Sequence, residues 1–264
     1  MRALRLLAVL LPFASLAIAQ TAKKSSHSTF SATPMTRAQA AEVLQASLAA
    51  AGGTAALSQI RDYVGVGTIT YYWAGKEVKG EATIRGRGTA QFRLDAKVAG
   101  GVRSWAVSND FGQVKEIDGT ISQIPYHNAI GLRALTFPGL RMMEAALGHN
   151  LTISAKTIAM RGGKFHEVAV QPQLPDNKLS HLAAMNYFID PNTFAIVAVH
   201  NQTHPNETMT RDIPHAVYYS DFRVVNGSLV PFSIAETLDT NRTWSLQLNS
   251  VTFNTGLTDA DFRF

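Results

Sequence analysis

The stretch Val217–Ile234, which reads Val-Tyr-Tyr-Ser-Asp-Phe-Arg-Val-Val-Asn-Gly-Ser-Leu-Val-Pro-Phe-Ser-Ile, decides the fold class. Two runs rich in β-branched and aromatic residues flank the dipeptide Asn226-Gly227. Asn and Gly tolerate the positive φ angles of a type I′ turn, whose twist matches that of the strands on either side. The stretch therefore predicts a β-hairpin with its tight turn at Asn226-Gly227.

Alternation along the two arms of this hairpin assigns side chains to faces. Tyr218 and Phe222 should point to one side of the sheet and Tyr219 to the other. Pro231 has no N–H to donate to a neighbouring strand, so the second arm should have an edge or a bulge there. The stretch contains no nucleophile, metal-binding cluster or phosphate-binding loop. It therefore predicts the fold but not a chemical activity.

Period-two patterns separated by turn residues continue on both sides of the hairpin. The predicted strands cover residues 63–73, 78–85, 90–98, 102–108, 113–124, 151–159, 164–171, 182–189, 194–200 and 243–253. In the strand over 90–98, alternation places Phe92 and Leu94 on an apolar face and Gln91 on the exposed face. Turn signals about every ten residues are typical of an antiparallel sheet or barrel.

Helical patterns occupy two places in the chain. Thr36 and Gln39 form a capping-box signal before apolar residues at helical spacing, and this helix should end at Gly52-Gly53. Residues 125–150 indicate two short helices interrupted at Pro138-Gly139, and residues 172–178 indicate a loop. No repeat or linker divides the remainder, so residues 36–264 are predicted to form a single domain.

The N-terminus has the features of a Sec signal peptide. Arg2 and Arg5 precede an apolar run over residues 6–18, and Ala17-Ile18-Ala19 fits the small-x-small cleavage rule. We expect cleavage after Ala19, a disordered leader over residues 20–35, and a periplasmic or secreted protein. The alternative is a buried N-terminal helix, which the flanking residues fit less well.

Composition narrows the class of protein. Of the 264 residues 46% are hydrophobic and 16% charged, which is typical of a globular chain. Without Arg2 and Arg5, 22 basic residues face 19 acidic ones, and a net charge of +3 is too mild to favour nucleic-acid binding. The chain has no cysteine, which excludes disulfides, thiolate metal sites and cysteine nucleophiles.

Signals for catalysis are weak. The sequence lacks the G-x-S-x-G elbow of serine hydrolases and a dinucleotide-binding glycine motif. A zinc site could be built from His200, His204 and His215 with Glu207 and Asp212, the alternative being solvated loop histidines. Glu77 and Glu81 could form a carboxylate pair, although an exposed sheet face is the favoured explanation. We therefore assign no catalytic residue, metal or cofactor.

Several motifs in order resemble one family. They are the turn Asp190-Pro191-Asn192-Thr193, the hairpin with Tyr219-Ser220-Asp221-Phe222-Arg223 and Val230-Pro231-Phe232 around Asn226-Gly227, and the closing segment Asn254–Phe262. With the signal peptide and the helix ending at Gly52-Gly53, this order resembles the LolA/LolB-like periplasmic lipoprotein carriers over residues 36–264. The resemblance implies a mainly β (α+β) fold, in which a strongly curved antiparallel sheet forms a half-open barrel with short helices as plug or lid.

The resemblance also implies a function, the non-enzymatic binding of lipid or lipoprotein acyl chains in an apolar concave cavity. Its partners would be a lipid or an acylated lipoprotein, with an envelope membrane as a possible further partner, and the protein would be a monomer. Residues expected on the concave face are Phe92, Leu94, Trp105, Phe188, Ile196, Phe222, Phe232, Ile234, Leu246 and Leu248. Residues expected to form a flexible lid are Leu140, Met142 and Met143.

Two other interpretations stay open at the level of sequence. The same apolar residues could fill the barrel as an ordinary core, which would leave a structural envelope-interaction module. Alternatively, a secreted hydrolase could carry an unrecognised polar site in the same cavity.

Overall fold

The computed structural model describes residues 31–109, 111–160 and 163–264. The predicted signal peptide (residues 1–19) and residues 20–30 of the predicted leader lie outside the described residues.

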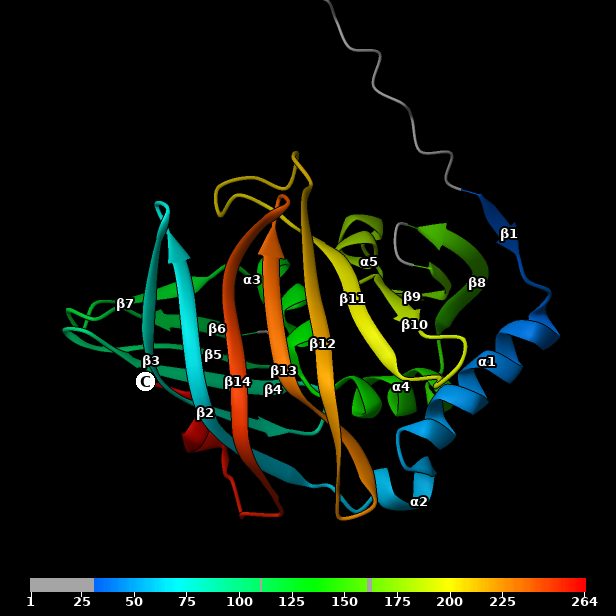
Figure 1. The fold of residues 1–264 in the computed structure, drawn as a ribbon. Coiled ribbons are helices and arrows are strands. Elements are labelled where there is room, and N and C mark those ends of the chain that lie inside the picture. The colour runs from blue at the N-terminus through cyan, green and yellow to red at the C-terminus, as the bar shows by residue number, and fades with distance from the viewer. Residues whose placement is uncertain (1–30, 110, 161–162) are drawn as a thin grey trace, which may run out of the picture.

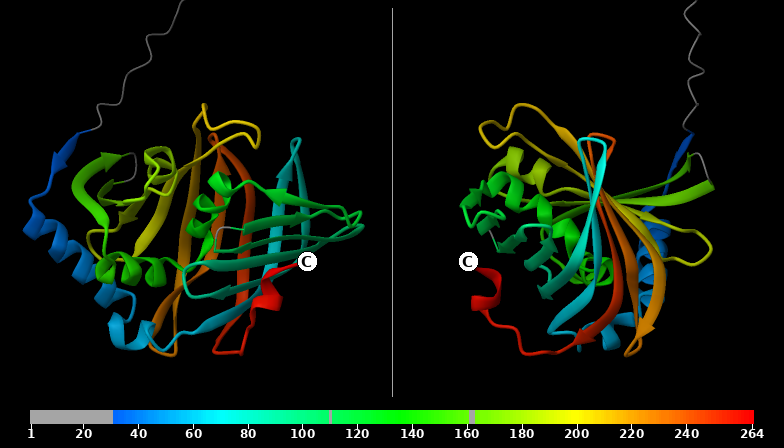
Figure 2. Two further views of the ribbon diagram at one scale, coloured as in Figure 1. Left: turned by 180° about the vertical axis from the view of Figure 1, so that it is seen from behind. Right: turned by 60° about the vertical axis from the view of Figure 1, so that its left-hand side comes forward.

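The described chain is dominated by one antiparallel sheet that curves strongly without closing (Figures 1 and 2). Its strands in chain order are β1 (Ala32–Pro34), β2 (Asp62–Trp73), β3 (Lys76–Arg87), β4 (Gln91–Val98), β5 (Gly101–Ser108), β6 (Phe111–Lys115), β7 (Ile121–Ile124), β8 (Leu151–Met160), β9 (Gly163–Pro172), β10 (Met185–Ile189), β11 (Ile196–Thr203), β12 (Ile213–Val225), β13 (Ser228–Leu238) and β14 (Asn241–Phe253). Their order across the sheet is β1-β8-β9-β10-β11-β12-β13-β14-β2-β3-β4-β5-β6-β7. The predicted curved antiparallel sheet is confirmed.

This order joins two meanders at one seam. Strands β2–β7 and β8–β14 each pair with their neighbours in sequence, and β14 pairs with β2 from Phe253↔Tyr63 to Trp244↔Tyr71. Gly67 lies in this seam, where a Cβ atom would stand only 2.0 Å from the carbonyl oxygen of Gln247. The close approach of the two strands therefore requires glycine at this position.

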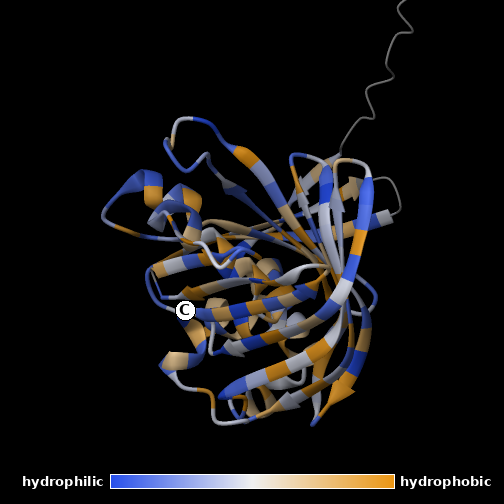
Figure 3. Ribbon diagram, turned by 90° about the vertical axis from the view of Figure 1, so that its left-hand side faces the viewer, coloured by the Kyte–Doolittle hydropathy of each residue, from blue (hydrophilic) through white to orange (hydrophobic). Residues whose placement is uncertain are grey.

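The helices lie inside the curve and at its edge (Figure 2). They are α1 (Arg37–Ala50), α2 (Gly53–Leu57), α3 (Tyr126–Ala129), the 3-10 helix η1 (Gly131–Leu135), α4 (Pro138–Leu147), α5 (Asn177–Leu182) and the 3-10 helix η2 (Asp259–Phe262). Apolar side chains of α1, α2, η1 and α4 join those of the concave sheet face in one buried cluster. Figure 3 shows hydrophobic and hydrophilic residues alternating along the strands, as a sheet with one covered face requires.

The predicted start and end of α1 are both observed. The Thr36 hydroxyl accepts from the Gln39 backbone N–H at 3.2 Å, and the Gln39 side chain accepts from the Thr36 backbone N–H at 2.9 Å. At the other end Gly52 has φ +117°, and the Leu229 N–H donates to the Ala51 carbonyl at 3.0 Å. The end of α1 thus rests on the β12–β13 turn.

The predicted hairpin turn is confirmed, because Asn226 and Gly227 have φ angles of 46° and 81°. Pro231 lies where β13 is paired with β12 but not yet with β14, which is the expected local edge. The expected grouping of Tyr218 with Phe222 is wrong. Tyr218 is exposed, whereas Phe222 packs against the core, because Asp221 takes a positive φ of 50° and interrupts the alternation.

Three further local predictions are corrected. Residues 32–34, assigned to the leader, pair with β8 as strand β1. Residues 177–182, of which 177–178 were predicted as loop and 182 as strand, form α5, whose N-cap Asp176 accepts from the Lys178 N–H at 2.7 Å. Gln91 is buried rather than exposed, because its amide donates to Ser108 at 2.8 Å and to Asp259 of the C-terminal segment at 3.1 Å.

Candidate functional site

A cavity of about 700 Å³ opens at the end of the half-barrel where the β2–β3 and β13–β14 hairpins turn. Five aromatic side chains line it: Tyr71, Tyr72, Trp73, Trp105 and Trp244. Val78, Val98, Ala99 and Ile117 add aliphatic surface. Its volume lies within the range of about 300–1,000 Å³ usual for small-molecule sites, and its walls are mainly apolar, as such sites require.

The aromatic wall runs from a buried floor to an exposed mouth. Trp105 and Trp244 meet edge to face with ring centroids 5.7 Å apart, and Trp244 is only 2% exposed. Trp73, beside the β2–β3 turn, is 73% exposed. Leu94 pairs across the sheet with Trp105, and Leu246 follows Trp244 on the same face of β14, so the buried core begins directly behind the floor.

An arginine–carboxylate pair forms the polar side of the cavity. Arg103 donates from Nε and Nη2 to the two carboxylate oxygens of Glu116, both at 2.9 Å. Its guanidinium carbon lies 5.6 Å from the Trp105 ring centroid and 6.0 Å from that of Tyr71. Burial raises the pKa of Tyr71, and the neighbouring Arg103 offsets part of that rise. The bidentate pair keeps this wall close to electrical neutrality.

A second carboxylate in the wall is also paired. Glu236 is 8% exposed; one of its oxygens lies 3.0 Å from His215 Nε2, and the other accepts from the Thr243 hydroxyl at 2.5 Å. His215 Nδ1 lies 2.6 Å from the side-chain oxygen of Asn201, whose amide donates to the Gly131 carbonyl. Each oxygen of Glu236 therefore has a polar partner.

The structure brings most of the sequence-predicted lining residues together, but as packed side chains. The buried core contains Phe92, Leu94, Leu140, Met142, Ile196, Phe232, Ile234, Leu246 and Leu248. Trp105, Met143 and Phe222 are partly buried against it. Of the thirteen residues predicted to line the cavity, Trp105 lines the large cavity. Ile196 and Phe222 line a hollow of about 10 Å³.

Phe188 is the exception, and its expected place on the concave face is corrected. It belongs to a separate cluster with Ile158 and Ala198. Its neighbours Tyr187 and Ile189 point into the main core, so alternation along β10 turns Phe188 to the opposite side of the sheet.

The residues that sequence reasoning missed are mainly aromatic. Tyr71, Tyr72 and Trp73 stand out in the sequence as a run at a strand end, and that run was the available signal. Trp244 shares its strand face with the predicted Leu246 and could have been found by extending the alternation. Arg103 and Glu116 come from the two arms of the β5–β6 hairpin, just beyond the Ser104↔Lys115 pair, so cross-strand pairing in this hairpin was the available signal.

The histidine and carboxylate candidates have other partners. His204 and His181 lie 2.8 and 3.0 Å from the two oxygens of Asp212, and the ring of His200 packs against Phe188 at 4.2 Å. Within residues 31–109, 111–160 and 163–264, no three or more His, Asp or Glu side chains are grouped to hold a metal ion. Glu77 and Glu81 form exposed ion pairs with Lys79 and Lys97.

A comparison with solved structures shows which proteins have a similar fold. Solved structures of LolA superfamily and lipoprotein-sorting proteins share the architecture, so the family resemblance read from the motifs is confirmed at the level of the fold. No protein-family model and no curated protein matches the sequence.

Three solved structures have a fold similar to that of this chain. One is described as an outer membrane lipoprotein-sorting protein domain from Vibrio parahaemolyticus (TM-score 0.52, 12% identity, covering 85% of this chain and 96% of that one). A LolA superfamily protein from Nitrosomonas europaea aligns with TM-score 0.50 and 12% identity over 84% of this chain and 97% of that one. A DUF1329 family protein from Desulfovibrio piger aligns with TM-score 0.51 and 8% identity over 84% and 96%. Across the part of this chain that the structure describes, no helix has the length and apolarity needed to cross a membrane.

Proposed function

We propose that this protein is a non-enzymatic carrier that binds an acyl chain, of a lipid or of an acylated lipoprotein, in the cavity walled by Tyr71, Trp73, Trp105 and Trp244. The observation that carries the proposal is the combination of a cavity of about 700 Å³ with a mainly apolar, aromatic lining, in which the carboxylates of Glu116 and Glu236 have hydrogen-bond partners. The LolA-like fold supports it, since a similar structure is described as a lipoprotein-sorting domain. The predicted signal peptide supports a location in the periplasm or outside the cell.

The energetics favour such a ligand. Each methylene removed from water contributes about 0.8 kcal/mol, so ten methylenes in the cavity would contribute roughly 8 kcal/mol before the costs of ordering. What remains suffices for micromolar or somewhat weaker binding. The acyl chain would enter past Trp73 and lie against the Trp105–Trp244 floor, with Leu94 and Leu246 behind it.

The intrinsic fluorescence of the protein offers a direct test. The chain has three tryptophans, and all three line this cavity. Titration of delipidated protein with an anthroyloxy-labelled fatty acid should therefore give saturable quenching of tryptophan emission together with energy transfer to the label.

A matched pair of variants locates the binding. Val98 lines the cavity on β4, and Val224 is 72% exposed on β12 beside the Asn226-Gly227 turn. A carboxylate is costly to desolvate, so Val98→Glu should weaken binding by about tenfold or more, whereas Val224→Glu should leave it unchanged. Absence of saturable binding to wild-type protein that retains its circular dichroism would contradict the proposal and favour a structural role.

A further inference from the structure

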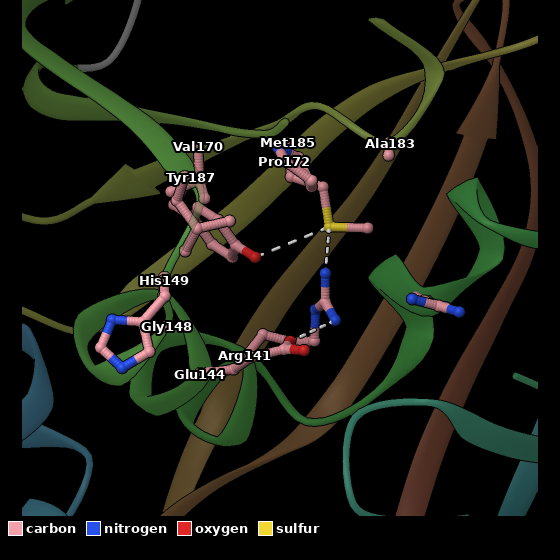
Figure 4. A pocket seen from close by; sticks show the side chains of 12 residues that line it. Arg141, Glu144, Gly148, His149, Val170, Pro172, Ala183, Met185 and Tyr187 are labelled. Atoms are coloured by element: carbon pink, nitrogen blue, oxygen red, sulfur yellow. Dashed lines mark hydrogen bonds and ion pairs between the residues drawn. The ribbon is translucent and has the colours of Figure 1, made fainter. Parts of the chain in front are cut away.

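A second cavity, which shares no lining residue with the first, lies between α4 and strands β9 and β10 (Figure 4). Its volume is about 190 Å³. That is far more than the roughly 10–15 Å³ that one water needs, and less than the roughly 300 Å³ at which drug-sized sites begin. The cavity is therefore of a size for a small molecule.

The centre of this cavity holds a buried arginine with poor acceptors. The Arg141 side chain is 10% exposed, and Nη1 donates to the Glu144 carboxylate at 2.5 Å and to the Thr89 carbonyl at 3.4 Å. Nη2 donates to the thioether sulfur of Met185 at 3.4 Å, the Tyr187 hydroxyl also interacts with the guanidinium, and Nε is buried with no hydrogen-bond partner among the described residues. A guanidinium has five N–H donors, and a thioether is a weak acceptor, so much of the hydrogen-bonding capacity of Arg141 is unused.

A second donor converges on the same sulfur. The Tyr187 hydroxyl donates to Met185 Sδ at 3.6 Å, and Figure 4 shows it and the Arg141 guanidinium approaching the sulfur from two sides. Met185 and Tyr187, which both lie on β10, are almost fully buried. A charged N–H and a phenolic O–H pointing at one position are what an oxyanion oxygen requires. Here the flexible methionine side chain occupies that position.

The charges of the lining specify the kind of oxyanion. Arg141 meets the Glu144 carboxylate through Nη1, while Nη2 faces the Met185 sulfur, so one edge of the guanidinium is directed at a position that a single carboxylate could take. Ala145, Leu151 and Val170 supply apolar wall. A monoanion with a short aliphatic part matches both features.

We propose that this cavity binds a small aliphatic carboxylate, whose oxygen displaces the Met185 thioether and accepts from Arg141 Nη2 and the Tyr187 hydroxyl. Arg141 binds the carboxylate, Tyr187 orients it, and Met185 fills the site when no ligand is bound. This site is independent of acyl-chain binding in the aromatic cavity.

The test uses the full chain and sodium propionate, with sodium chloride at equal ionic strength as the reference, in isothermal titration calorimetry and two-dimensional NMR. Wild-type protein should show saturable binding with shifts at the Met185 methyl group. Arg141→Gln should weaken binding by about tenfold or more and Tyr187→Phe by roughly fivefold, the usual effects of losing a charged and a neutral hydrogen bond. Arg242→Gln, at an exposed arginine on β14, should change nothing.

The most discriminating variant is Met185→Leu, which keeps the volume of the side chain and removes the competing sulfur. It should bind propionate more tightly than wild type, and it does not depend on whether Arg141→Gln folds. The proposal is overturned if propionate has no saturable effect beyond that of chloride, if Met185→Leu fails to tighten binding, or if inorganic phosphate binds and propionate does not.

Discussion

The buried carboxylate of Asp62 on β2 binds the C-terminal segment to the sheet through hydrogen bonds. Its oxygens accept from the Thr255 N–H at 2.6 Å, the Thr255 hydroxyl at 2.7 Å and the Gly256 N–H at 3.1 Å. Burial alone would raise the pKa of Asp62, but these hydrogen bonds outweigh it and lower the pKa below the usual 3.8. The ionised form is therefore the one that stabilises the fold.

The lowered pKa of Asp62 determines how its contribution to folding stability depends on pH. Because the folded pKa lies below the unfolded value, the contribution of Asp62 is complete above about pH 4 and is lost as the pH falls through the folded pKa. Asp62→Asn should lower the free energy of unfolding at pH 7 by roughly 1–3 kcal/mol and lose less stability than wild type between pH 5 and pH 3. Urea unfolding at both pH values measures this, and parallel losses in the two proteins would contradict it.

Gly52 is the residue at which α1 meets the hairpin turn. A Cβ atom there would lie 2.5 Å from the Gly227 carbonyl oxygen, in a backbone with φ +117°. Gly53 also has a positive φ, of +74°, but nothing lies within 4 Å of its Cβ position. Both alanine variants should lose the roughly 1–2 kcal/mol of a left-handed residue. Gly52→Ala should lose more because of the clash, and equal melting temperatures for the two variants would argue against the contact.

At the scale of elements, the sequence was most informative where the determining interactions are local. The Asn226-Gly227 turn, the Thr36–Gln39 capping box and the period-two strands depend on residues a few positions apart. Asp221 could not be predicted to interrupt β12, because its contacts include a hydrogen bond from Gln247, which is distant in sequence. Gln91 is buried by the C-terminal segment, which lies far away in sequence.

The candidate site was harder to predict for the same reason. The alternation of Phe92 and Leu94 identifies the apolar face, but whether that face is covered by other side chains or borders a hollow depends on helices distant in sequence. The structure covers most of the predicted lining residues and leaves the hollow beyond Trp105 and Trp244.

The capping box of α1 provides a prediction at this scale. Thr36→Ala removes an acceptor from the first turn and should lower the free energy of unfolding by about 1 kcal/mol. Gln45→Ala, at an exposed position of the same helix, should be neutral or slightly stabilising, because alanine is the better helix former. Chemical denaturation of both variants checks the pair, and equal effects would show that the cap is not what stabilises the helix.

For the whole molecule, the β14–β2 seam makes one sheet of two meanders. Gly67→Ala would place a Cβ atom 2.0 Å from the Gln247 carbonyl, so the strands must separate and stability should fall by roughly 1–3 kcal/mol or more. The neighbouring exposed Thr68→Ala should cost less than about 1 kcal/mol. Differential scanning calorimetry should show a single transition moved to lower temperature. An unchanged midpoint would mean that β14 and β2 can move apart at Gly67 without loss of stability.

The same seam bears on the order in which the chain can acquire its structure. Tyr63 finds its partner only when Phe253 becomes available, so during synthesis one edge of β2 stays unpaired until β14 has been made. Pairing of such distant segments is slow, because a long loop must close before any contact rewards it. An unpaired β2 meanwhile offers hydrogen-bonding groups to any other extended chain. A protein built in this way is therefore exposed to aggregation for as long as β14 is missing.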